Sequence, residues 1–593
     1  MIVNSFFSEN SPLLSVMGDF KVRKYQKELS VFISESIDNY SISVIEAPTG
    51  SGKTLAYLIP VLMSDKKVII STKSKQLMNQ IFYKDIAQLM RAGAVNRKVA
   101  VLKGKKNYFC HMRYSKYILP YAEEYSDIVS WYENSSEKYI LEVPVGFTDD
   151  ATYDKISADS FQCVGSKCEY FARCSFYRAK EVANASDIVI TNHHLLLTDV
   201  AAKSKLQYLS NFEGFEHIIF DEAHSIVDIF PLYAGDEISV SNIKKFLKEQ
   251  IKSVKPSEYL SIQNKIMLYE SSVKGKEYFN EEYEEKLKNI INDIKEFVLP
   301  KVGEDERENF AKIENSFSYI KEHDGIKITE NTGRNVYIKL LPLRINDMFY
   351  QGLMKTCFSA TFISATLTVN NSFEFYKREL GLPEDTLEYV VSKENFKKNS
   401  VYAIPKNISK KEEIYREVVS QFDGPILIIF NSIKTMEYIY RFLLENVKGR
   451  NIILQQNINI GEYLADRCDV ILGCAVLREG VDIKTNCRNK CVILDKLPFE
   501  NISDVYLQMK ANLVREEGRD PFLSFYLPRA VIYFKQAIGR LIRSEEDYGL
   551  CVILDDRMLK KGYGKSFLEI LDGVVFHNIN EAINFLEENY GGD

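Results

Sequence analysis

The stretch SVIEAPTGSGKTLAYLIPVLM, Ser43 to Met63, decides how the first part of this chain folds. A short β-branched apolar run leads into a glycine-rich loop, and the loop leads into an apolar helical segment, which is the context that a phosphate-binding loop requires. Gly50 and Gly52 let the backbone turn its N–H groups toward phosphate oxygens, and the dipole of the following helix adds to that field. Lys53 is expected to contact the outer phosphates and Thr54 to bind Mg²⁺. The nucleotide-binding loop residues are therefore Gly50, Ser51, Gly52, Lys53 and Thr54.

A second motif, HIIFDEAH from His217 to His224, places two carboxylates at the end of another apolar run. Asp221 is positioned to hold Mg²⁺ through water, and Glu222 to polarise the water that attacks the terminal phosphate. Four letters alone are a weak signal, but after a phosphate-binding loop and an apolar strand they predict a site of nucleotide hydrolysis. His224 either couples this site to another domain or only packs against it.

The segment QAIGRLIR, Gln536 to Arg543, lies far downstream and completes the expected catalytic set. If it is helical, Gln536, Gly539, Arg540 and Arg543 share one face, because their spacing is i, i+3, i+4 and i+7. Either arginine can then stabilise charge on the transferred phosphate. The alternative is a surface helix with salt bridges. The expected catalytic residues are Lys53, Asp221, Glu222, Gln536, Arg540 and Arg543.

Short apolar, β-branched runs alternate with helical segments through both halves of the chain. Continuous apolar strands of this kind are typical of parallel sheets covered on both faces, so two sets predict two α/β domains. Two segments interrupt this alternation of strands and helices. Residues 106–185 are aromatic-rich, and residues 229–345 are charged and mostly helical. The ten runs are 43–47, 67–72, 98–102, 187–191 and 217–220 in the first half, and 425–430, 451–454, 469–473, 491–494 and 551–554 in the second.

Composition limits the class of protein. A chain of 593 residues with 46% hydrophobic and 27% charged residues predicts a globular protein of several domains. It has neither an apolar run long enough to span a membrane nor a recognisable signal peptide, so a cytoplasmic location is expected. The net charge of −6 means that a nucleic acid would have to bind a local basic groove.

Four of the ten cysteines, Cys110, Cys163, Cys168 and Cys174, lie between the two nucleotide motifs. In a cytoplasmic chain, clustered cysteines favour a metal site over disulfides. The spacings of four and five residues between the last three are wider than the usual zinc pairs, and four thiolates suit either zinc or a 4Fe–4S cluster. Spacing alone therefore leaves both metals open.

These motifs together resemble the XPD/DinG family of superfamily-2 iron–sulfur helicases, and most of all its bacterial DinG branch. The resemblance runs from about Phe20 to Phe567. It implies two RecA-like motor domains, ATP with Mg²⁺, and a 4Fe–4S cluster on the four cysteines. Supporting segments are FKVRKYQ (20–26), STKSKQLMNQ (71–80), LKGKKNYFC (102–110), TNHHLLLTD (191–199), SATL (364–367), REGVD (478–482) and KLPF (496–499).

The resemblance also implies roles for single residues. Arg23 and Gln26 flank the adenine, and Asp482 of REGVD contacts ATP from the second domain. The single-strand path in the first domain is expected to include Thr72, Lys73 and Gln80. Basic and aromatic residues around Cys110 are expected to contact phosphates and stack on bases; they are Lys103, Lys105, Lys106, Tyr108, Phe109, Arg113 and Lys116.

The chain departs from the family pattern at three places. Leu477 and Arg478 stand where the family usually has Phe-Trp, and SKENF (392–396) replaces the usual Ser-Pro-Phe. SATF (359–362) competes with SATL for the motif that couples hydrolysis to movement, and we assign SATL because its leucine matches.

The expected protein is thus a monomeric ATP-dependent DNA helicase that moves 5′ to 3′ on single-stranded DNA and unwinds duplex, forks or R-loops in repair or replication. The alternatives are a DEAH-type RNA helicase and a nucleic-acid clamp with a redox-sensing cluster. The expected boundaries are 1–105, 186–228 and 346–370 for the first motor domain, 106–185 for the iron–sulfur insertion, 229–345 for a helical arch and 371–593 for the second motor domain.

Overall fold

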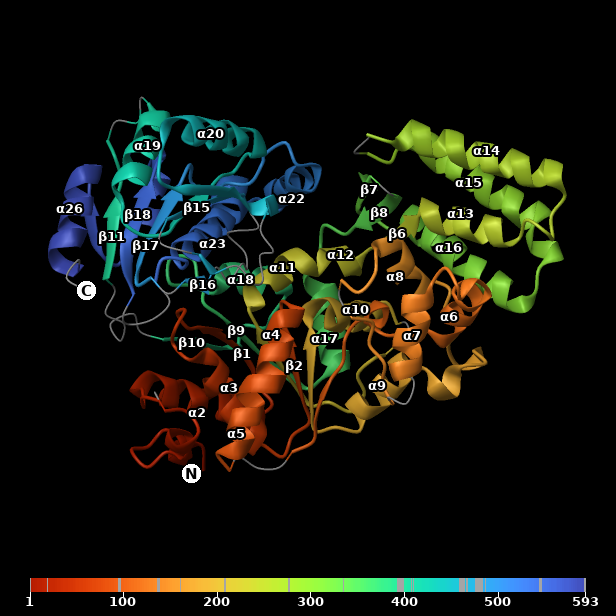
Figure 1. Ribbon diagram of the computed structural model, residues 1–593, viewed down its shortest axis with the longest axis horizontal. Helices are drawn as coiled ribbons and strands as arrows, with labels where there is room; N and C mark the ends of the chain where they lie inside the picture. Colours follow the sequence, from red (N-terminus) through yellow and green to blue (C-terminus); the bar gives the residue numbers. More distant parts are fainter. Residues whose placement is uncertain are drawn as a thin grey trace.

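The computed structural model describes residues 2–18, 20–93, 97–135, 139–144, 146–159, 161–206, 210–275, 278–333, 335–391, 399–406, 408, 410–457, 464–465, 468–474, 484–485, 487–542 and 547–590. Figure 1 shows two sheets, each flanked by helices, and a helical lobe beside the first of them. Among the described residues, no helix is long and apolar enough to cross a membrane.

The first sheet has seven parallel strands in the order β10-β1-β9-β5-β2-β4-β3. Successive side chains along a strand point to opposite faces of the sheet: Val44 and Ile218 pack into the core on one face, and Ile45 and Ile219 into the core on the other. Burial on both faces explains why these strands are continuous apolar runs. The strands are β1 Ile42–Glu46, β2 Val68–Thr72, β3 Val99–Val101, β4 Ile188–Asn192, β5 His217–Asp221, β9 Ser359–Ser364 and β10 Leu387–Val390.

Helices cover both faces of this sheet. They are α2 Lys24–Asp38, α3 Lys53–Met63, α4 Lys75–Gln80, α5 Ala87–Arg91, α9 Ser175–Asn184, α10 His193–Ser204, α17 Asn346–Thr356 and α18 Glu374–Leu380. A π-helical segment, Ile81–Ile86, joins α4 to α5. The short helix α1 (Ile2–Phe6) also belongs here, because Phe6 and Phe7 pack into the core beneath α2 and α3.

The second sheet is also parallel and seven-stranded, in the order β13-β15-β12-β17-β18-β11-β19. Its strands are β11 Asn399–Ala403, β12 Ile426–Ile429, β13 Asn451–Leu454, β15 Asp469–Gly473, β17 Asn489–Leu494, β18 Tyr548–Ile553 and β19 Val574–Phe576. The helices α19 (Lys411–Gln421), α20 (Ile433–Asn446) and α26 (Ile579–Tyr590) pack on one face, and α23 (Leu527–Ile538) packs on the other.

All ten predicted apolar runs form strands, and two parallel α/β domains are confirmed. The expected domain boundary at residue 370 is wrong, because β10 pairs with β1 and α18 packs into the first core. The first domain therefore continues through β10. Helix α22 (Val505–Glu516), much further along the chain, belongs to the second domain and contacts α18 through Lys510 Nζ, which lies 3.3 Å from Glu379 Oε2.

Two excursions leave the first sheet, each between strands that are neighbours in it. The first runs from β3 to β4 and includes α6 His111–Tyr117, α7 Ser126–Ser135 and α8 Asp150–Ile156, which share a small core around Phe109. The second runs from β5 to β9 and forms the helical lobe (residues 229–345), with α13 Val240–Glu249, α14 Pro256–Val273, α15 Glu281–Phe297 and α16 Glu304–Glu322.

The helical lobe also contains strands that the sequence did not predict. They are β6 Asp236–Ser239, β7 Ile326–Asn331 and β8 Val336–Leu341, paired antiparallel in the order β6-β8-β7. The apolar stripe on α15 packs inward as expected, with Leu287, Ile290 and Ile294 buried.

Candidate functional site

The glycine-rich loop joins β1 to α3 and is held from α2. Gly50 and Gly52 have φ of 76° and 75°, a left-handed conformation that glycine adopts without steric penalty. Arg23 donates to the carbonyl of Gly50 at 2.8 Å, and Gln26 Nε2 donates to the carbonyl of Gly52 at 3.0 Å. The expected adenine-flanking residues therefore support the loop directly. Lys53 Nζ lies in the same loop, 3.2 Å from the carbonyl of Ala47.

The carboxylates of the acidic box lie at the end of β5, opposite this loop. Tyr57, buried on α3, donates its hydroxyl to Asp221 Oδ2 at 3.1 Å, which ties the box to the loop helix. Glu222 has φ of 54°, which is unusual for a non-glycine residue and is found mostly where function requires it.

The two carboxyl groups titrate in opposite directions. Burial, and then the charge of Glu222, raise the pKa of Asp221 to about 7. Burial alone would raise the pKa of Glu222 as well, but the hydrogen bond from His224 and the charges of Lys53 and Arg540 hold it below its usual value. Glu222 is thus the carboxylate that stays ionised, as a residue that polarises water must. Its interaction with Arg540 crosses from the first domain to the second.

His224 connects the box to the motif that follows β9. Its Nδ1 lies 2.8 Å from Ser364 Oγ and 3.3 Å from Glu222 Oε2. Ser359, at the other end of β9, bonds instead to His217 at 2.7 Å. The structure thus supports SATL, and not SATF, as the motif beside the site.

The second domain reaches this site through α23. Gln536 Nε2 lies 3.5 Å from Thr366 Oγ1, and Thr49 of the glycine-rich loop donates to the carbonyl of Ile542 at 3.2 Å. The predicted single helical face is wrong in part: α23 ends at Ile538, so Arg540 lies in the turn beyond the helix. Arg543, Asp482, the REGVD motif, Leu477, Arg478 and SKENF lie outside the described residues.

Several buried polar atoms around the loop have no hydrogen-bond partner among the described residues: Gln26 Oε1, Ser51 Oγ, His224 Nε2 and Gln536 Oε1. Buried polar atoms in folded proteins are almost always paired, so a group of unpaired atoms at one place indicates a polar ligand site. These residues come from both domains and from four separate segments. The sequence motifs identified three of the four segments, and the resemblance supplied Gln26.

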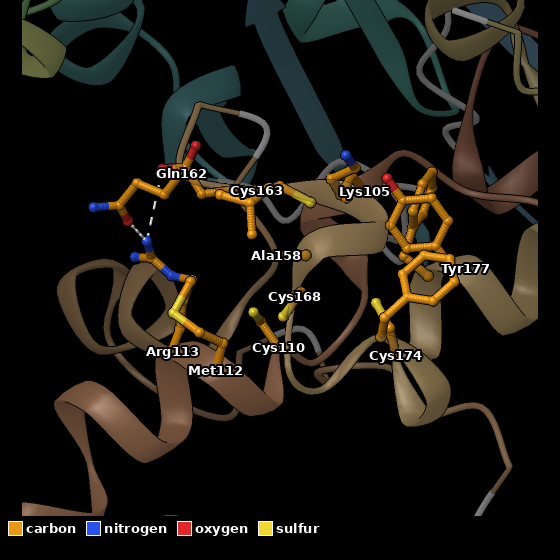
Figure 2. Close-up of a pocket in the computed structure, with 15 residues that line it drawn as sticks. Lys105, Cys110, Met112, Arg113, Ala158, Gln162, Cys163, Cys168, Cys174 and Tyr177 are labelled. Atoms are coloured by element: carbon orange, nitrogen blue, oxygen red, sulfur yellow. Dashed lines mark hydrogen bonds and ion pairs between the residues drawn. The ribbon is translucent and has the colours of Figure 1, made fainter. Parts of the chain in front are cut away.

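The four clustered cysteines line one pocket. Figure 2 shows the side chains of Cys110, Cys163, Cys168 and Cys174 around a common space. Cys110 precedes α6 and Cys174 precedes α9, so the pocket joins both ends of the first excursion. Burial raises the pKa of the Cys110 thiol to about 11.

Within the described residues, no three His, Cys, Asp or Glu side chains are grouped tightly enough to hold a single metal ion. All four cysteines are free thiols, each partly exposed. Four sulfurs around one space fit a group with several attachment points, such as a 4Fe–4S cluster. The donor set is therefore compatible with the expected cluster.

Two aromatic residues near the cysteines cannot stack on bases as expected. Tyr108 and Phe109 are buried, and Phe109 stacks on Tyr132 with ring centroids 5.0 Å apart. Arg113 is also buried and bonds to Gln162 and to the carbonyl of Asp154. These side chains hold the excursion together and do not face solvent.

Basic residues collect instead where β2, β4 and β3 end, because these three neighbouring strands are parallel. Lys73 and Lys75 follow β2, His194 follows β4, and Lys103 follows β3. Burial and then the charge of Lys103 lower the pKa of Lys75, while Lys103 itself pairs with Glu142 Oε2 at 2.6 Å. The carboxyl edge of parallel strands is where α/β sheets usually bind ligands.

Three family models match the chain: the DEAD/DEAH box helicase at residues 26–121, DEAD_2 at 78–243 and the helicase C-terminal domain at 415–573. The chain is 28% identical to the ATP-dependent DNA helicase YoaA of Haemophilus influenzae, over 99% of each chain. It is 26% identical to the 3′-5′ exonuclease DinG of Bacillus subtilis, over 96% of this chain and 72% of that one.

Solved structures show the same fold. One described as an XPD helicase matches with a TM-score of 0.58 at 19% identity, covering 94% of this chain and 99% of its own. Xpd4 of S. tokodaii matches with a TM-score of 0.53 at 14% identity, covering 93% of this chain and 100% of its own. In its two parallel α/β domains, its matches to helicase family models and its relatives, the chain is thus similar to the helicase YoaA and to DinG over nearly its whole length, with the fold of the XPD structures.

Proposed function

We propose that this protein is an ATP-dependent DNA helicase. One observation carries the proposal: the nucleotide loop and the segment after β9 bond to the second domain, Thr49 to the carbonyl of Ile542 at 3.2 Å and Thr366 to the Gln536 amide at 3.5 Å, and the charges of Lys53 and Arg540 both act on Glu222. A hydrolysis site that draws charged groups from both domains changes its interactions when the phosphate leaves. Relative movement of the domains then follows hydrolysis, which is what a nucleic-acid motor requires.

The residues divide the chemistry between them. Gly50, Ser51, Gly52 and Lys53 cradle the phosphates, Arg23 and Gln26 flank the base, and Thr54 and Asp221 would hold Mg²⁺. When bound, Mg²⁺ neutralises charge on the outer phosphates. Glu222 orients the attacking water, and Gln536 and Arg540 stabilise the charge that develops on the transferred phosphate. Arg543 and Asp482 are assigned to the same site by the resemblance.

The single-strand path is proposed along the carboxyl edge of β2, β4 and β3. Lys73 and Lys75 supply positive charge there without making the whole protein basic, whereas Lys103 pairs with Glu142 Oε2 at 2.6 Å and burial lowers the pKa of His194. Thr72 is buried, and its hydroxyl accepts from the backbone N–H of Ser74, so its part is to shape the edge.

The cysteine pocket is proposed to hold a 4Fe–4S cluster on Cys110, Cys163, Cys168 and Cys174. The cluster would tie the two ends of the first excursion together, since Cys110 comes from its start and the other three from its end. The helical lobe contacts the same region: Lys312 of α16 donates to the carbonyls of Phe161, at 2.7 Å, and of Cys163, at 3.3 Å.

The direction of movement is proposed as 5′ to 3′, from the order of the excursions. The cysteines lie between the glycine-rich loop and the acidic box, and the helical lobe lies between the box and SATL, as in the family that the sequence resembles. A monomer acting on forks or R-loops in repair or replication is part of the same proposal.

The test is ATP turnover by the purified chain with single-stranded DNA, single-stranded RNA or duplex, followed by unwinding of duplexes with a 5′ or a 3′ tail. Stimulation by single-stranded DNA and unwinding of the 5′-tailed duplex are expected, and both should weaken with salt. Stimulation by RNA alone would indicate an RNA helicase. Unwinding of the 3′-tailed duplex alone would refute the direction, and turnover that no nucleic acid changes would refute the motor.

A further inference from the structure

The interface between the motor domains contains a buried charged cluster that makes none of the expected phosphate contacts. It consists of Lys535 on α23, Glu46 at the end of β1 and Thr368 in the segment after β9. Lys535 Nζ lies 2.8 Å from Glu46 Oε1 and 3.2 Å from Oε2, and it donates to Thr368 O and Oγ1, each at 2.8 Å. Only 10% of the lysine side chain and 8% of the glutamate side chain are exposed.

Glu46 has partners within its own domain even without the lysine. The backbone N–H groups of Leu367 and Thr368 each donate to Glu46 Oε2 at 2.6 Å, and the Thr368 hydroxyl donates to Oε1 at 2.8 Å. The carboxylate therefore fixes the segment after β9 onto the end of β1. The first domain keeps these bonds if α23 moves away, whereas the lysine loses its bonds to Glu46 and Thr368.

Each member of the cluster belongs to a segment that leads to the nucleotide site. Glu46 immediately precedes the loop that begins at Ala47, and Thr368 follows Ser364, which bonds to His224. Lys535 immediately precedes Gln536, whose amide lies 3.5 Å from Thr366 Oγ1. The position of one ammonium group is thus linked to the loop, to the segment after β9 and to α23.

A second cross-domain ion pair lies nearer the start of α23 and differs in kind. Arg529 lies 2.8 Å from Asp228 Oδ1 of the first domain, but its guanidinium also bonds to Glu500 of its own domain, with one contact at 2.9 Å. Arg529 therefore keeps a carboxylate partner if the domains separate. At Lys535, as at Lys510 beside Glu379, the carboxylate lies across the interface, and Lys535 directly precedes Gln536.

We propose that Lys535 is a positioning residue that sets the register of α23 on the first domain. In the formed contact, Gln536 and Arg540 face the loop and Glu222. When the contact breaks, both side chains withdraw together, because they follow Lys535 within two turns of chain. The inference rests on the proposed ATP hydrolysis and adds the contact that makes turnover depend on docking of the domains.

The test compares full-length Lys535→Met with wild type and with Lys560→Met. The control removes an exposed lysine that pairs with Asp556 on the same domain, and it should leave turnover unchanged. Fluorophores at exposed Glu35 on α2 and Lys434 on α20 report the distance between the domains. Lys535→Met should widen the distance distribution and lower kcat for ATP about tenfold to a hundredfold. The KM for ATP should stay within about threefold, since the loop keeps its own contacts.

Lys535→Arg keeps the charge and should restore most of the turnover, which loss of packing alone would not explain. Lys535→Gln replaces the methionine variant if that variant does not fold. A distance distribution identical to that of wild type would overturn the proposal, whatever the turnover. If wild-type protein shows no ATP turnover, the proposed function fails, and the distance measurement, which needs no hydrolysis, still decides this inference.

Discussion

Replacing Gly52 with alanine tests how tightly α2 holds the nucleotide loop. Gly52 has φ of 75°, and a Cβ placed there would lie 2.2 Å from Gln26 Nε2. A left-handed residue with a side chain costs about 1–2 kcal/mol. The amide of Gln26 must also move, which breaks its 3.0 Å bond to the carbonyl of Gly52 and costs about 0.5–1.5 kcal/mol more.

Gly93 provides the matched control. It has φ of 83°, and no atom of the described residues lies within 4 Å of a Cβ placed there, so Gly93→Ala carries the backbone penalty without the collision. Gly52→Ala should therefore destabilise the first domain by about 1–2 kcal/mol more than Gly93→Ala. This difference is the sum of the broken hydrogen bond, about 0.5–1.5 kcal/mol, and about 0.5 kcal/mol for a Gln26 side chain forced away from its preferred rotamer. For a domain of this size that is a difference of about 2–8 °C in the melting transition.

The assay is calorimetric unfolding of both variants, together with ATP binding by isothermal titration. Combining Gly52→Ala with Gln26→Ala should recover part of the loss, because the collision disappears with the side chain. Equal melting transitions for Gly52→Ala and Gly93→Ala would show that Gln26 yields without penalty, and the reasoning from the 2.2 Å approach would then be refuted.

Three further outcomes are expected. Lys53→Ala should abolish ATP turnover in a folded protein, whereas Glu222→Gln should still bind ATP and fail to hydrolyse it; comparable turnover in wild type and either variant would contradict the assignments. Cys168→Ser should lose the roughly four irons per chain expected after anaerobic preparation but keep some ATP turnover, with the exposed Cys468→Ser as control; stoichiometric zinc in wild type would count against the cluster. Burial raises the pKa of Asp85 to about 6, so its protonated form favours the fold and stability is lost as pH rises through 6. Asp85→Asn should therefore stabilise the protein by about 1–2 kcal/mol at pH 7.5 and not at pH 4, as measured by unfolding in urea; an equal effect at both pH values would contradict the burial argument.

The sequence predicted strands well where both faces of a strand are apolar, and less well where polar side chains are buried. β9 reads SATFIS, and its hydroxyls are paired across the sheet: Thr361 with Ser43 at 2.9 Å and Ser359 with His217. These partners lie more than 140 residues away in sequence, so no local pattern reveals them. Sequence motifs therefore predicted the strands only where the core itself is apolar.

At the site, too, local motifs predicted residues correctly, whereas features that depend on distant parts of the chain were missed. Spacing identified Lys53, Asp221 and Glu222, because each directly follows an apolar strand or its loop. It misplaced Arg540, because helix periodicity does not reveal that α23 ends at Ile538. The sequence predicted that Tyr108 and Phe109, which lie among basic residues, are exposed and stack on bases. In the structure, Phe109 stacks instead on Tyr132 of α7.

The place of β1 in the first sheet has a consequence for synthesis of the chain. Its two neighbours are β9 and β10, which lie at residues 359–364 and 387–390, while β1 itself ends at residue 46. The strand that carries the nucleotide loop therefore emerges from the ribosome more than 300 residues before either neighbour exists. A nascent chain that stops short of β9 should gain no protection from ATP, however complete its motifs are. Protease resistance conferred by ATP should appear only once both strands have been made.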